Sequence, residues 1–73
     1  MDTTELTRVT TAIVDHVAPS GRVFIHEVDT GRPGFLANTT PTVNLSRIAP
    51  GQHISVEVRD SGDVMVVMSA RPA

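Results

Sequence analysis

A cation, an aromatic ring and an imidazole alternate with two aliphatic side chains in the pentapeptide Arg22-Val23-Phe24-Ile25-His26. In an extended strand successive side chains point to opposite faces, so Val23 and Ile25 would enter a core while Arg22, Phe24 and His26 share the outer face. An aromatic ring can stack on a nucleobase, and arginine can pair with a phosphate. The pentapeptide therefore predicts a surface strand with the groups needed to bind single-stranded nucleic acid.

Other combinations of residues that could do chemistry are sparse. Asp15, His16 and Ser20 lie close together in the chain, but they straddle a turn and include no glycine-flanked nucleophile. The chain has no cysteine, and its three histidines, His16, His26 and His53, are too far apart in the sequence for a short metal-binding motif. No glycine-rich phosphate loop precedes a helix. We therefore expect no enzyme activity, no metal site and no cofactor.

Length and charge narrow the class of protein. The chain has 73 residues and a net charge of −2, and all six basic residues are arginine. A single domain of this size buries only about 60% of the surface that its unfolded chain exposes. The acidic balance argues against binding nucleic acid mainly through bulk charge. No apolar run approaches a membrane span and no secretory signal is evident, so we expect a cytoplasmic protein without a membrane partner.

Alternating apolar residues and turn residues predict five short strands, without a long helix. Their expected ranges are about 8–17, 22–28, 35–38, 54–59 and 64–68. Residues 39–49 are expected to form a loop with one helical turn, because Leu45 and Ile48 are three residues apart. Residues 69–73 are expected to form a short tail.

The first of these segments has two interpretations. Leu6, Val9, Ile13 and Val17 recur at helical spacing. Against a helix, the segment is rich in threonine and valine, whose branched side chains favour strands. We choose a strand over about residues 8–17, and the helix remains the alternative.

A single small sheet must close on itself to bury its apolar face and to remove its edges. The expected fold class is therefore all-β: a small five-stranded antiparallel barrel of the oligonucleotide/oligosaccharide-binding (OB) kind. One short helical turn is expected between the third and fourth strands. Residues 1–7 are expected to form a flexible N-terminus, and residues 8–71 a single domain.

Several motifs occur in an order that is typical of one family. They are Gly21-Arg22-Val23-Phe24-Ile25, Arg32-Pro33-Gly34-Phe35-Leu36, Pro50-Gly51-Gln52-His53-Ile54-Ser55-Val56-Glu57-Val58 and Met68-Ser69-Ala70-Arg71. In this order the chain resembles the S1 RNA-binding domain, a branch of the OB-folds, over about residues 9–71. Residues 47–51 are also similar to bacterial translation initiation factor one, and residues 23–26 to a ribonucleoprotein motif of cold-shock domains.

The resemblance implies a site. In S1-like domains the phenylalanine of the second strand and the one after the glycine of the third strand lie on the RNA-binding face. Carried over by position, these are Phe24 and Phe35, with Arg22, His26 and Arg32 nearby. The implied ligand is single-stranded RNA or DNA, held by base stacking with arginine support. The alternative is that both phenylalanines, the only aromatic residues, pack in the core.

A second function is compatible with the same barrel. The acidic net charge, the absence of lysine and the polar N-terminus favour a protein-interaction or assembly module with no nucleic-acid ligand. Such a module could use an exposed strand edge. The sequence leaves open the ligand, its sequence specificity and the oligomeric state.

Overall fold

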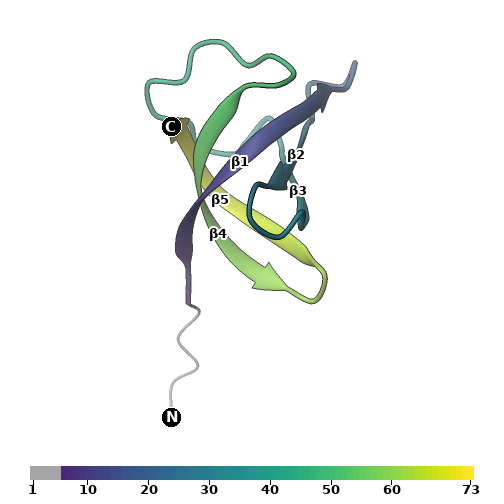
Figure 1. The fold of residues 1–73 in the computed structure, drawn as a ribbon. Helices are drawn as coiled ribbons and strands as arrows, with labels where there is room; N and C mark the ends of the chain where they lie inside the picture. The colour runs from purple at the N-terminus through teal and green to yellow at the C-terminus, as the bar shows by residue number, and fades with distance from the viewer. Residues whose placement is uncertain (1–5) are drawn as a thin grey trace.

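Five strands form one closed sheet in the computed structural model, which describes residues 6–73. They are β1 (Arg8–Val17), β2 (Val23–Glu27), β3 (Pro33–Leu36), β4 (His53–Ser61) and β5 (Val64–Pro72). The strand order is β1-β2-β3-β5-β4, with β4 pairing back onto β1 to close the barrel (Figure 1). The predicted all-β, five-stranded, OB-like barrel is confirmed. Most of the predicted flexible N-terminus, residues 1–5, lies outside the described residues.

The first segment is a strand and not a helix. β1 pairs with β2 on one side and with β4 on the other, which accounts for its branched threonine and valine residues. Its inward side chains Ala12 and Val14 are fully buried. At the other end of the chain, β5 is longer than predicted. Residues 69–72, expected as a tail, continue the strand because they pair with residues 54–57 of β4.

One strand pair differs from the antiparallel prediction. β3 and β5 run parallel, with Gly34 opposite Met65 and Phe35 opposite Val66. The reason is the path of the chain after β3. The connection after β3 brings the chain to the start of β4 at the end of the barrel where β3 finishes. β4 then runs antiparallel to β3, and β5 returns in the direction of β3 (Figure 1). The glycine permits close approach here, since a Cβ at Gly34 would lie 3.1 Å from the Met65 carbonyl oxygen.

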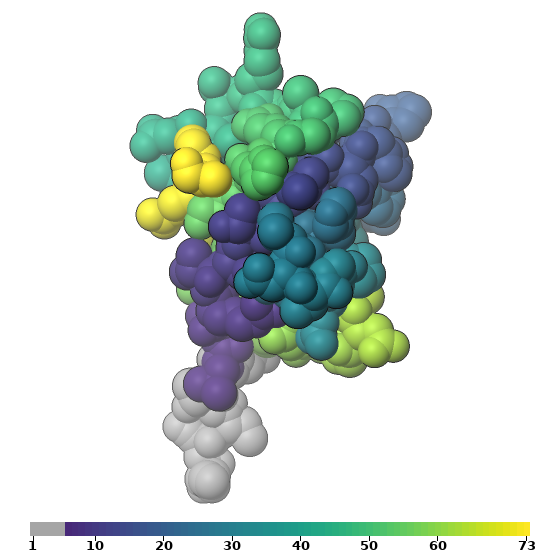
Figure 2. Space-filling model, in the orientation of Figure 1, coloured from purple at the N-terminus to yellow at the C-terminus, as the bar shows by residue number. Residues whose placement is uncertain are grey.

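The predicted helical turn between β3 and β4 is wrong, since residues 37–52 contain no helix. Apart from two isolated turn hydrogen bonds, within residues 37–40 and 49–52, the backbone of this segment bonds to β1 and β5. The Val43 N–H donates to the Ala70 carbonyl, and the Ala70 N–H donates to the Pro41 carbonyl. Leu45 and Ile48 pack against the core from this irregular chain. Their spacing of three residues therefore comes from an irregular connection that covers one end of the barrel. This connection is the green segment in Figure 2.

The barrel interior is filled by aliphatic side chains from all five strands. Val23 and Ile25 are buried, as the alternation in β2 predicts. The complete set of buried apolar residues is Ala12, Val14, Val23, Ile25, Leu36, Ile54, Val56, Val58, Met65, Val67 and Ala70. Residues 6–73 contain no helix long and apolar enough to cross a membrane.

Candidate nucleic-acid interface

Three rings lie side by side on the outer face of β1, β2 and β3. His16 and Phe24 stack with ring centroids 4.7 Å apart and planes 19° apart. Phe24 and Phe35 meet at 6.4 Å with planes tilted by 47°. Strand register explains the row, because His16 is opposite Phe24 and Phe24 is opposite Phe35. We call these three residues the ring row.

The ring row is on the surface and not in the core. Phe35 is 43% exposed and Phe24 is half-buried. Neither belongs to the cluster of buried residues that fills the barrel. The alternative that the two phenylalanines are core residues is therefore wrong, and both rings have area available to a ligand.

A β-bulge places His16 in the ring row. The pairing of β1 with β2 shifts between Val14 and His16, so Asp15 is an extra residue in β1. Without the bulge His16 would face inward like Val14, because alternate side chains share a face. His16 was not among the residues predicted for the site. Nothing in the alternation of apolar residues marks the extra residue.

Arg22 lies over the outermost ring. Its guanidinium carbon is 4.6 Å from the centroid of the Phe35 ring, which is cation–π geometry. Within residues 6–73 Arg22 forms no ion pair with a carboxylate. Its positive charge thus lies beside the ring row, and no carboxylate of the described part of the chain neutralises it.

His26 shares the outer face with Phe24, as predicted, but it has a carboxylate partner. Its Nδ1 lies 2.7 Å from Oδ1 of Asp15, the extra residue of the bulge in β1. The partner is therefore across the strand pair and not the neighbouring Glu27 or Asp29. A phosphate at this position would have to compete with Asp15 for the imidazole.

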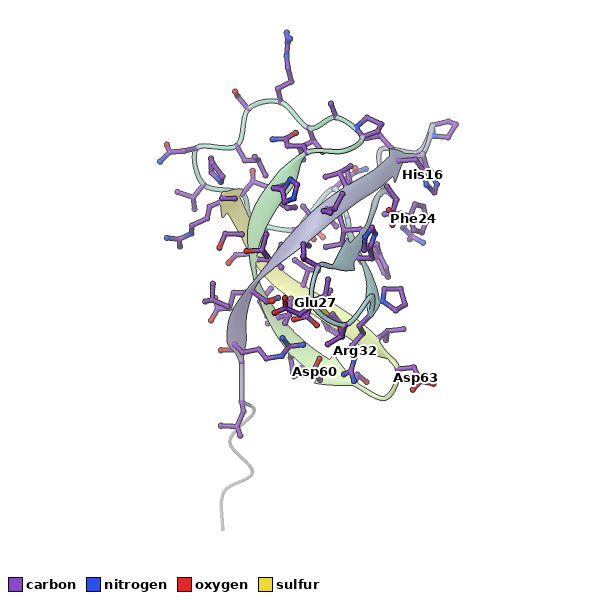
Figure 3. The ribbon with its side chains drawn as sticks, in the orientation of Figure 1. His16, Phe24, Glu27, Arg32, Asp60 and Asp63 are labelled. Carbon is purple, nitrogen blue, oxygen red and sulfur yellow. The ribbon has the colours of Figure 1, made fainter. Side chains whose placement is uncertain are left out.

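Arg32, the fifth predicted residue, is not brought to the ring row. Its Nη1 donates to Oδ1 of Asp60 at 2.9 Å. Figure 3 shows Arg32 with Asp60 and Glu27, while His16 and Phe24 lie toward the other end of the barrel. The loop after β2 folds onto the β4–β5 hairpin, and this separates Arg32 from the other predicted residues.

A buried carboxylate closes the barrel end where Arg32 lies. Glu27 is only 2% exposed. It accepts hydrogen bonds from Nη2 of Arg8 at 3.2 Å, from Thr10 at 2.6 Å and from Thr30 at 2.7 Å. The Arg8 hydrogen bond, followed by those of the two threonines, lowers the pKa of Glu27 from its ordinary 4.5 to about 2.

The same arginine continues the network to Asp60. Nε and Nη2 of Arg8 both donate to the Asp60 carboxylate at 2.9 Å. Hydrogen bonding to Arg8 is the main reason that the pKa of Asp60 is lowered. We call Arg8, Glu27, Arg32 and Asp60 the carboxylate network. The sequence offered a signal for Glu27: it lies two residues after Ile25, on the inward side of the β2 alternation.

Two shallow pockets adjoin the ring row. A polar one of about 270 Å³ is lined by Ser20, Arg22, Ala37, Asn38 and Thr39. An apolar one of about 240 Å³ is lined by Phe35, Ala37, Thr40, Val64, Met65, Val66 and Val67. Among residues 6–73, no group of three or more His, Asp or Glu side chains is arranged to hold a metal ion.

Comparison with known proteins supports the fold. No family model and no curated protein matches the sequence. A solved structure of a CusF fragment from Escherichia coli, a tryptophan-to-alanine variant with Cu(II), matches with a TM-score of 0.62 and 13% sequence identity. The match covers 100% of this chain and 99% of that one. Likeness at this identity shows the barrel alone. The resemblance to the S1, initiation-factor and cold-shock families stays a prediction, and the chain is similar to a small OB-like barrel.

Proposed function

We propose that the ring row and Arg22 bind single-stranded nucleic acid by base stacking. The observation that carries the proposal is the register of three rings on one exposed face, with a guanidinium over the outermost ring. Bases stack on Phe24 and Phe35, and Arg22, beside the outermost ring, attracts a phosphate of the bound strand. Stacking on an aromatic side chain contributes about 1–3 kcal/mol per base and tolerates any base sequence.

The charge distribution makes this a weak binder. The net charge is −2, and His26, which lies two residues after Phe24 on β2, is paired with Asp15. Arg22 is the main cation beside the rings. Each phosphate contact on a single strand contributes a slope of about −0.7 in log affinity against log salt. We therefore expect the affinity for the oligonucleotide to depend only weakly on salt, with the slope that one phosphate contact gives.

Amide NMR during titration with a short single-stranded oligonucleotide at low salt tests the proposal. We expect shifts at residues 16, 22–26 and 33–37. The outer face of β4 and β5 provides an internal control, because its groove, lined by Val9, Ser55, Glu57, Ser69 and Arg71, contains no residue of the ring row and none of β2 or β3. Shifts that are absent, or that are as large in this control groove as in the ring row, would show that the proposal is wrong.

A protein-interaction role has one observation in its favour. Val64 and Met68 are 45% and 39% exposed on β5, and Val64 lines the apolar pocket beside Phe35. A partner could not add a strand at the edge of β3 or β5, because the closed sheet pairs these two strands with each other. Light scattering over a range of protein concentrations tests self-association through the face. A constant monomer mass over this range would exclude self-association through this face.

A further inference from the structure

The polar pocket beside Phe35 lies where β2 begins and β3 ends. Two loops form its walls, one with Ser20 and the other with Asn38 and Thr39. The Asn38 side-chain amide donates to the Ser20 carbonyl at 3.4 Å and so joins the loops. Gly21 makes the contact possible. It has a φ of +94°, and a Cβ there would lie 2.6 Å from Oδ1 of Asn38.

The chemistry of the pocket suits an oxyanion. Of its five lining residues, only Ala37 lacks a polar side chain, and none is acidic. Arg22 supplies a full positive charge, and no carboxylate among residues 6–73 pairs with it. The Ser20 and Thr39 hydroxyls and the Asn38 amide are further donors. A guanidinium with neutral donors around it is a common setting for phosphate oxygens.

We propose that this pocket is a phosphate subsite that holds the terminal phosphate of the bound strand. The inference deepens the proposed function and rests on it for the strand itself. The joined loops lie at this end of β2 and β3, so their pocket is placed to receive the end of a strand that lies over the rings. A terminal phosphate carries a charge of about −1.5 to −2 near pH 7, whereas an internal phosphodiester carries −1. Arg22 therefore attracts the end of the strand more strongly than its interior.

Fluorescence anisotropy with one oligonucleotide in three forms tests the terminal preference. The forms carry a 5′-phosphate, a 3′-phosphate, or hydroxyls at both ends. We expect one phosphorylated form to bind about five- to tenfold more tightly than the hydroxyl form. Arg22→Gln and Thr39→Val should each reduce this ratio, and the first should bring it close to one. Arg71→Gln, a matched change at an exposed arginine of the control groove, should leave the ratio unchanged.

Inorganic phosphate, titrated at constant ionic strength, tests the pocket without any base. We expect amide shifts at residues 20–22 and 37–39 in the wild type, and none there in Arg22→Gln. If oligonucleotides bind but all three forms bind equally, the phosphate subsite is wrong and the stacking site stands. If inorganic phosphate shifts these amides but no oligonucleotide binds, the stacking function is wrong and the pocket stands as a phosphate site. If phosphate shifts only other residues, the pocket is not the site.

Discussion

Arginine has opposite roles at the ring row and in the carboxylate network. In the network, Arg8 and Arg32 both donate to Asp60, and Arg8 also donates to the buried Glu27. Beside the ring row, Arg22 lies over Phe35 and has no carboxylate partner among residues 6–73. The charges of the network are neutralised within the protein, whereas the charge at the ring row faces solvent.

This difference assigns the two regions different roles: the carboxylate network stabilises the fold, and the ring row serves the proposed binding. The network joins the start of β1, the end of β2, the loop after β2 and β4 at one end of the barrel. Its loss should weaken the fold. The ring row lies outside the buried core, since Phe35 is 43% exposed and Phe24 is only half-buried. Its loss should weaken binding and leave the fold in place. Four predictions follow this division.

The largest effect is expected from Glu27→Ala. The substitution leaves Arg8, Thr10 and Thr30 without their shared acceptor at the barrel end. We expect the free energy of unfolding in urea to fall by about 2–3 kcal/mol. Glu57→Ala is the control, because Glu57 is an exposed glutamate bonded by hydroxyls; it should change stability by less than about 0.5 kcal/mol. Equal losses in the two variants would contradict the division.

The network should also set the acid limit of stability. The pKa of Glu27 is about 2 in the folded protein and 4.5 ordinarily, so below pH 4.5 the unfolded chain binds a proton that the folded protein does not. Stability contributed by Glu27 is therefore fully present above pH 4.5 and is lost as the pH falls toward 2. The lowered pKa of Asp60 acts in the same direction. Urea unfolding across this range should show a flatter acid limb in Glu27→Gln, and an unchanged limb would contradict the assignment.

At the ring row, Phe35→Leu should lower the affinity for a short single-stranded oligonucleotide about tenfold, because one stacking surface is lost. Since Phe35 is half exposed, the urea midpoint should change little. Anisotropy and urea unfolding of the same protein sample measure both quantities. A large loss of stability without a loss of affinity would place Phe35 with the structural residues.

The smallest effects come from a matched pair of arginines. Arg22→Gln should weaken oligonucleotide binding about threefold, since the loss of one phosphate contact is partly screened. Arg32→Gln should leave binding unchanged and lower the melting temperature by only about one or two degrees, because exposed ion pairs contribute little. If Arg32→Gln weakened binding as much as Arg22→Gln, the ring row would not be the whole site.

The barrel was predictable because short-range patterns carry most of its information. Alternation placed Val23 and Ile25 inside and Phe24 outside, and the turn residues separated the five strands. The same rule also places Glu27 inside, but short-range patterns do not show what would stabilise a charged residue there. Buried carboxylates are rare unless they are paired, and the main partner, Arg8, is 19 residues away in the chain.

The candidate site was only partly predictable. Arg22, Phe24, His26 and Phe35 do share one face, since cross-strand pairing follows from strand order. Arg32 precedes Phe35 by three residues and nevertheless lies with Asp60, because the loop after β2 folds onto the β4–β5 hairpin. Proximity in the chain does not determine proximity in space once a loop intervenes.

By itself the sequence determined the fold class, the strand positions and the face on which each β2 side chain lies. The physical reason is that these depend on local alternation and on turn residues. Only the tertiary structure decided which side chains meet. The bulge at Asp15 turned His16 outward, and the register of β3 against β2 brought Phe35 to Phe24. These features come from pairing between distant segments, whose geometry depends on closing the whole barrel.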